Sequence, residues 1–219
     1  MSRSQRENPK RQGMIFVTSS SGGAWTFCNP IPPVVLVIAL AIIGVELVLS
    51  AGQYTSVGGG AGIGWRVQAL TDYAFSPNVL DWMIARNDYR PELAQRFISY
   101  AFVQPSFLNA LFAAAMVLAL GKFVGDVFSA IATAAVFFFS TVMGALVFGL
   151  ILSGPTPLIG AFPGIYGLIG AFTYILWLQL GNAGENQLQA FRLIGFLLGL
   201  QLVYGLLFGV TVTWIAELA

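Results

Sequence analysis

The chain has 219 residues, of which 57% are hydrophobic and only 9% are charged. Soluble domains carry about 25% charged residues, so this composition argues against a globule in water and indicates a membrane protein. The net charge of +1 argues against a nucleic-acid partner, because phosphate binding needs clustered Lys and Arg. One cysteine and no histidine remove the usual metal ligands and the commonest general base, so we expect neither a metal nor another cofactor.

The N-terminal segment, residues 1–33, is predicted to lie outside the membrane. Its first part is polar and carries four basic side chains against one acidic side chain, Glu7. Prolines separate this part from the first long apolar run, and no clear small-residue cleavage site follows, which argues against a signal peptide. We interpret residues 1–33 as a cytoplasmic tail with a pre-membrane segment, and residues 34–219 as one transmembrane domain.

Residues 34–51 form the first predicted spanning helix. The run is apolar apart from Glu46 and Ser50. At roughly 1.5 Å per residue it can just cross a hydrocarbon core of about 30 Å. Glu46 has two interpretations: its carboxylate reaches the headgroup region from the last third of the helix, or it pairs with a polar group on another helix.

Residues 52–96 are more polar and are predicted to form an extracytoplasmic amphipathic loop. The segment contains a Gly-rich turn, several aromatic residues, and four arginines balanced by four acidic residues. Segments that mix aromatic and charged residues in this way tend to lie at a membrane surface. Membrane lipid is therefore an expected partner.

Four further apolar runs predict four more spanning helices. The runs cover residues 106–120, 127–152, 164–180 and 193–212, and the connections cover residues 121–126, 153–163 and 181–192. Short connections make neighbouring helices antiparallel, so the prediction is an all-α membrane protein with five spans. A sixth span could follow Ala219.

The distribution of basic residues favours a cytoplasmic N-terminus. With the tail inside, Lys122 and Arg192 also fall in inside connections, whereas residues 153–163 carry no Lys or Arg. Short cytoplasmic loops are enriched in Lys and Arg. We therefore expect the N-terminus in the cytoplasm, the long loop outside it, and a location in the bacterial inner membrane.

Glycines recur just before and within the apolar run 164–180, at Gly160, Gly164, Gly167 and Gly170. Small residues three or four positions apart let a helix approach its neighbours closely, so we predict that these glycines are helix-packing positions within the chain. The run Gly160–Ala171 resembles, without a gap, the nucleophile motif of the rhomboid intramembrane proteases. That family has Gly-x-Ser-Gly followed by an aromatic residue, Gly and Ala, with the Ser where a loop becomes a helix N-terminus.

The departures from the family pattern fall on its functional positions. Phe162 occupies the place of the nucleophile, and Pro163 occupies the place of the next Gly. Phe has no nucleophilic atom, whereas Pro suits the first turn of a helix because its missing N–H would be unpaired there. The resemblance therefore predicts that the helix still starts at this position but carries no nucleophile.

Two other stretches resemble the family more weakly. Gln104 and Asn109 match the two His positions at the entry to the family's second span, and Ala113 matches the Asn one helical turn further on. Near the end of the chain, Glu217 follows Ala216 where the family's last catalytic span has Ala-His. These matches place Gln104, Asn109 and Glu217 in the cleft of the former active site, where they either hydrogen-bond one another or hold a polar group of a partner.

The resemblance implies a rhomboid-like helical bundle that is an inactive pseudoprotease rather than an enzyme. A replacement nucleophile would be Ser153 with Glu217 as its base, but no Gly-x-Ser turn presents Ser153. Such a protein would bind, stabilise or assemble other transmembrane proteins. The alternatives are a structural subunit of a large respiratory or photosynthetic membrane complex and a small-molecule or lipid transporter. The scarcity of intramembrane charges argues against the transporter.

Overall fold

The computed structural model describes residues 31–54, 62–192 and 194–196. Within them all regular structure is helical, and the one β-type pairing is an isolated bridge. Four of these helices are long and apolar enough to cross a membrane: α1 (Pro33–Tyr54), α6 (Phe107–Val127), α7 (Ala130–Ile151) and α8 (Phe162–Asn182). The predicted all-α membrane protein is confirmed to the extent of four candidate spans. The fifth predicted span, residues 193–212, lies outside the described residues except for a short helical stretch at 194–196.

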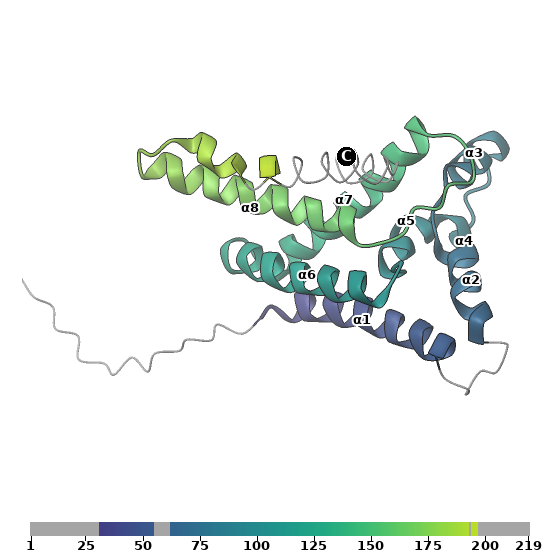
Figure 1. Cartoon of the computed structure of the whole chain (residues 1–219). Helices are drawn as coiled ribbons and strands as arrows, with labels where there is room; N and C mark the ends of the chain where they lie inside the picture. The colour runs from purple at the N-terminus through teal and green to yellow at the C-terminus, as the bar shows by residue number, and fades with distance from the viewer. Residues whose placement is uncertain (1–30, 55–61, 193, 197–219) are drawn as a thin grey trace, which may run out of the picture. The chain divides into compact units, whose positions relative to one another are not determined.

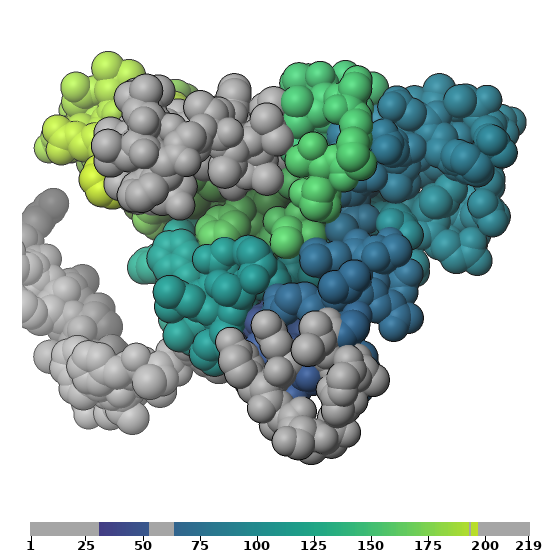
Figure 2. Space-filling model, turned by 45° about the vertical axis from the view of Figure 1, so that its right-hand side comes forward, coloured from purple at the N-terminus to yellow at the C-terminus, as the bar shows by residue number. Residues whose placement is uncertain are grey.

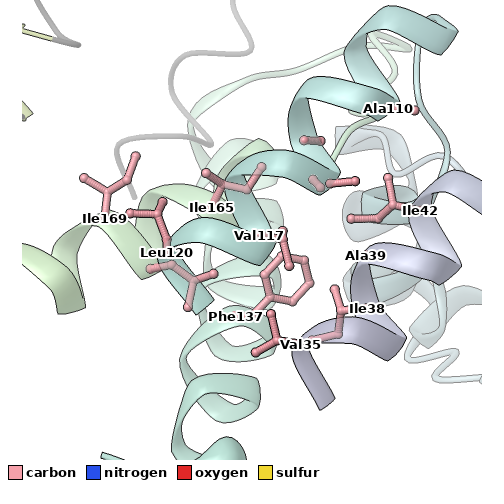
Figure 3. Close-up of a cluster of buried hydrophobic side chains, with 14 residues drawn as sticks. Val35, Ile38, Ala39, Ile42, Ala110, Val117, Leu120, Phe137, Ile165 and Ile169 are labelled. Carbon is pink, nitrogen blue, oxygen red and sulfur yellow. The ribbon is translucent and has the colours of Figure 1, made fainter. Parts of the chain in front are cut away.

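The four candidate spans share one apolar core. Helix α1 packs on α6, α6 also packs on α8, and α8 packs on α7 (Figure 1). Figure 3 shows side chains from all four helices converging around the buried ring of Phe137. The buried members of this core are Val35, Ile38, Ala39, Ile42, Ala110, Ala113, Ala114, Val117, Leu120, Phe137, Ala161, Ile165, Leu168 and Ile169. Alanines on α6 leave room for the branched side chains of α1, so the two helices approach closely.

Helix α6 is longer than the sequence suggests. The prediction that residues 121–126 form a connection is wrong, because α6 continues through them. A methyl group on Gly121 would come within 2.6 Å of Val35, and one on Gly125 within 2.7 Å of Pro32. These glycines therefore bring the end of α6 against the start of α1, where a larger side chain would hold the helices apart.

The segment predicted as an amphipathic loop folds into short helices. They are α2 (Gly62–Tyr73), α3 (Pro77–Arg86), α4 (Pro91–Ala94) and α5 (Arg96–Ser99), followed by the 3-10 turn η2 (Tyr100–Phe102). A second buried cluster joins this segment to α7 and to the loop after it, through Phe75, Leu80, Met83, Phe97, Tyr100, Ala145, Phe148 and Leu158. Figure 2 shows the segment, in blue, forming a continuous surface with the green loop that follows α7. Its position at a membrane surface stays a prediction.

Local signals set the ends of these elements. Helix α3 begins with Pro77 at its first position and ends at Asn87, which takes the left-handed conformation with φ 52°. The bridge between Phe75 and Leu158 ties the start of α3 to the loop between α7 and α8. After α8 the chain turns into the 3-10 helix η3 (Gln187–Phe191), which packs back on α8.

The structure supports the second interpretation of Glu46. Its side chain is fully buried within the protein, and its depth in the membrane stays a prediction. It pairs with a polar group on another helix, because Arg66 of α2 lies 2.6 Å from one carboxylate oxygen. That same oxygen accepts a hydrogen bond from the Ser50 hydroxyl.

Candidate functional site

The candidate site lies at the start of α8, where the Gly160–Ala171 motif begins. Gly160 has φ 102°, a conformation that a side chain makes unfavourable, and its N–H donates to the Tyr100 carbonyl at 3.0 Å. Ala161 is buried at the helix cap, and α8 then begins with Phe162 and Pro163. The predicted helix start with Pro in its first turn is confirmed, and η2 supports it from the side.

The position of the family nucleophile is occupied by an aromatic ring. The Phe162 side chain is half-buried and stacks on Phe112 of α6, with the ring centroids 6.2 Å apart and the ring planes 30° apart. The Phe162 ring packs against the apolar core, where Ala113, Ala161 and Ile165 are buried, whereas Phe112 is exposed. The start of α8 is therefore filled by carbon atoms on its α6 side.

Gln104 is brought to this site by the stretch that precedes α6. Its side chain is fully buried, and its Nε2 donates to the Ala101 carbonyl at 2.9 Å. Its Oε1 has no hydrogen-bond partner among the described residues, and it lies 3.5 Å from the point that a Cβ on Gly160 would occupy. Gln104 therefore presents a buried acceptor beside the backbone of Gly160.

The other residues of the resemblance are placed less closely. The Asn109 backbone N–H donates to the Ser106 hydroxyl at 3.3 Å, which caps α6, and the Asn109 side chain is half-buried. Gln104 Nε2 donates to the Ala101 carbonyl, and no hydrogen bond joins Gln104 to Asn109 within the described residues. Ala113 is fully buried in the core. Glu217 lies outside the described residues.

The four motif glycines differ in what surrounds them. A methyl group on Gly164 would come within 2.6 Å of the Phe137 ring and 2.8 Å of the Thr141 hydroxyl. A methyl group on Gly167 would overlap the Ser140 side chain, so both glycines lie directly against α7. Gly170 has nothing within 4 Å of its added methyl group, and Gly160 serves the turn before the helix.

Two residues that the sequence analysis did not single out as site residues hold the site in place. The Tyr100 hydroxyl donates to the Thr141 carbonyl of α7 at 2.7 Å, and burial raises the pKa of this phenol, so it stays protonated as a donor. Arg66 donates to the Gln104 carbonyl at 2.9 Å. The one available signal was Glu46 itself, because a charge within an apolar span needs a partner and Arg66 is the first cation after α1.

The described part of the site offers positioning groups rather than reactive ones. Its polar side chains are Gln104, Tyr100 and Thr141, and the Thr141 hydroxyl bonds the Phe137 carbonyl in its own helix. Among the described residues, no group of three His, Cys, Asp or Glu side chains could hold a metal ion. The arrangement can accept a hydrogen bond through Gln104 and can pack an apolar surface against Phe112 and Phe162.

Comparison with known protein families identifies this architecture. A family model described as the rhomboid domain matches residues 91–219, which is more than half of the chain. The matched region contains η2, α6, α7, α8 and the candidate site. No curated protein and no solved structure matches the chain. With over half of its length matched to the rhomboid domain, the chain belongs to the rhomboid family.

Proposed function

We propose that this rhomboid-family protein does not cut peptide bonds and instead binds other transmembrane proteins, which it stabilises or helps to assemble. One observation carries the proposal: Phe162 stands at the first position of α8, and its ring stacks on Phe112. A serine there would be a nucleophile at a helix N-terminus, but a phenyl ring can only pack. The absence of histidine from the sequence supports the same conclusion, because a serine nucleophile needs an adjacent base.

Ser153 is the nearest serine upstream of the motif and is the replacement nucleophile to consider. It follows the end of α7 and is exposed, at the start of the loop that leads to Gly160. The loop turns at Gly154, with φ 114°, after Ser153 rather than before it. This geometry fits a residue of the loop that leaves α7 and gives no support for a catalytic role.

The surface beside Phe162 is suited to an apolar helix. Four exposed apolar side chains lie on the first turns of α6: Phe107, Leu108, Leu111 and Phe112. In a bilayer such a surface contacts lipid, and a partner helix replaces lipid where side chains pack closely and a few polar groups pair. The buried Oε1 of Gln104, which lies beside Gly160, lacks a hydrogen-bond partner among the described residues.

Labelling with a serine-reactive fluorophosphonate tests the absence of catalysis. We expect no labelling of the purified protein, and none of Phe162→Ser, because a restored serine still has no histidine to activate it. Labelling of the unaltered protein that Ser153→Ala abolishes would overturn the proposal. An active rhomboid protease of known sequence, treated in parallel, is the positive control.

Site-specific photo-crosslinking in the native membrane tests partner binding. A photoreactive residue at Leu111 should crosslink to discrete transmembrane proteins, whereas one at Leu150, a still more exposed position on α7, should not. Equal crosslinking at both positions would contradict a docking surface beside Phe162.

Native mass spectrometry then distinguishes a permanent subunit from a transient regulator. One fixed mass indicates a stoichiometric subunit of a large membrane complex, and variable weak clients indicate a regulator.

A further inference from the structure

The end of α1 and the start of α2 are joined by a buried charge. The Glu46 side chain is 0% exposed, and its Oε1 accepts hydrogen bonds from the Ser50 hydroxyl at 2.9 Å and from Arg66 Nη2 at 2.6 Å. A buried carboxylate without a partner is strongly disfavoured, so this site requires the arginine. The pair therefore ties a spanning helix to the segment that precedes the candidate site.

Arg66 has a second contact that the ion pair does not need. Its Nη1 donates to the backbone carbonyl of Gln104 at 2.9 Å, across 38 positions of the sequence. One guanidinium thus joins α1, α2 and the stretch before α6. Because the guanidinium is rigid and planar, its two nitrogens hold the Glu46 carboxylate and the Gln104 carbonyl in a fixed relation.

Packing beside the pair fixes the same geometry independently. The Trp65 ring, next to Arg66 in sequence, lies so close to Gly52 of α1 that any side chain at Gly52 would overlap it. Glu46 Oε2 and Arg66 Nε are buried and have no hydrogen-bond partner among the described residues, so the pair meets through one oxygen and one nitrogen. The Nη1 atom of Arg66 is therefore free of Glu46 and donates to the Gln104 carbonyl.

We propose that Arg66 is a positioning residue for the candidate site, anchored by Glu46, and that it sets the place of the Gln104 backbone beside Gly160. Gln104 lies next to Gly160, and the Gly160 N–H is held by Tyr100, only four positions before Gln104. Movement of the Gln104 backbone would therefore displace the first turn of α8. This role holds whether or not a partner docks at the site.

Two variants separate the bridging role from simple charge pairing. Arg66→Lys keeps the positive charge, but its single ammonium cannot span the carboxylate and the carbonyl in the same fixed way. The exchanged pair, Glu46→Arg with Arg66→Glu, restores an ion pair between α1 and α2, but it places a carboxylate opposite the Gln104 carbonyl. Arg90→Lys is the matched control, because Arg90 pairs with Asp88 at the surface, far more exposed than Arg66.

The measurement is thiol labelling at the start of α8. Cys28 is the single cysteine of the chain, so Cys28→Ser with Ala161→Cys gives one reporter thiol at a position that is fully buried. We expect maleimide labelling to be about tenfold faster in Arg66→Lys and in the exchanged pair, the opening expected from one lost buried hydrogen bond. Arg90→Lys should label at the parent rate.

Hydrogen exchange at the Gly160 amide supplies a second readout without the reporter cysteine. The amide donates to the Tyr100 carbonyl, so it should exchange about tenfold faster in Arg66→Lys if that contact loosens. The proposal is overturned if Arg66→Lys leaves both rates at the parent value. It is equally overturned if the exchanged pair shows the parent rates of maleimide labelling and of hydrogen exchange. The ion pair alone would then account for the geometry.

Discussion

Two junctions of this molecule treat polar groups in opposite ways. At the junction of α1 and α2, a carboxylate is fully buried and held by an arginine and a serine. At the start of α8, where the rhomboid resemblance places a nucleophile, a phenylalanine packs on another aromatic ring. The buried charge of this chain thus serves to hold segments together, while the position expected for chemistry is apolar.

The difference has a physical basis. A buried ion pair gains little stability over well-packed apolar residues, but it strongly disfavours any arrangement that separates the two charges. Such a pair suits a junction whose register must be unique. Aromatic packing tolerates small shifts, so it suits a surface where a partner helix approaches from the membrane. The following predictions test this contrast, beginning with the largest effect.

Glu46→Leu should be the most destabilising of these changes. It leaves Arg66 largely buried without its carboxylate, and breaking a buried pair from one side costs about 3 kcal/mol. Asp88→Leu is the control, because the Asp88–Arg90 pair is exposed and contributes about 0.5 kcal/mol. Unfolding in a mild detergent would measure both. Equal losses in the two variants would show that the buried junction has no special importance.

Gly164→Ala should follow in size, because the added methyl group meets both Phe137 and the Thr141 hydroxyl. Overpacking of this kind costs about 2 kcal/mol. Gly170→Ala in the same helix is the matched control: its methyl group meets nothing within 4 Å, and alanine favours a helix over glycine by about 0.5 kcal/mol. Thermal unfolding of the two variants should therefore shift in opposite directions. Shifts in the same direction would contradict the close contact of α8 with α7.

The Tyr100 phenol should make stability depend on alkaline pH. Burial raises its pKa in the folded protein, so its contribution is complete below the ordinary value near 10 and is lost as the pH rises above it. Between pH 10 and pH 11 this group alone should lower the free energy of unfolding by about 1 kcal/mol.

Tyr100→Phe isolates that contribution from the other titrating groups. At neutral pH the variant should lose about 1 kcal/mol with the hydrogen bond to the Thr141 carbonyl. Its stability should then fall less steeply than that of the parent above pH 10. Parallel pH profiles of the two proteins would mean that Tyr100 titrates normally and is not held by α7.

The apolar runs predicted the candidate spans because bilayer thickness fixes the length of a spanning helix. The extent of α6 escaped prediction. Gly121 and Gly125 are typical of a loop by composition, and only their contacts with Val35 and Pro32 explain why they lie in a helix. Glycine in a membrane protein marks close approach as often as it marks a turn, and sequence does not separate the two.

The position of the candidate site in the sequence was predictable, but the contacts that bring distant segments to it were not. The motif and Pro163 correctly indicated where α8 begins. The contact of Gln104 with Gly160, and the bond from Arg66 to Gln104, join positions that are far apart in sequence. No periodicity encodes such contacts, because they depend on how separate helices pack. Glu46 left two interpretations open in the sequence, and the packing of α2 on α1 identifies Arg66 as its partner.

Phe162→Leu should have the smallest effect, and it tests the apolar half of the contrast directly. Leucine keeps most of the apolar surface but loses the stacking on Phe112, which is worth about 0.5 kcal/mol beyond burial. Phe172→Leu is the matched control, since it removes the similar pair with Phe123 elsewhere on α8 and α6. The two variants should be equally stable, yet crosslinking from Leu111 should change only in Phe162→Leu, because only that ring borders the proposed docking surface. If Phe162→Leu instead destabilised the protein as much as Glu46→Leu does, the start of α8 would be as rigidly specified as the charged junction. The apolar start of α8 and the Glu46–Arg66 pair would then not differ in how strictly they fix the structure.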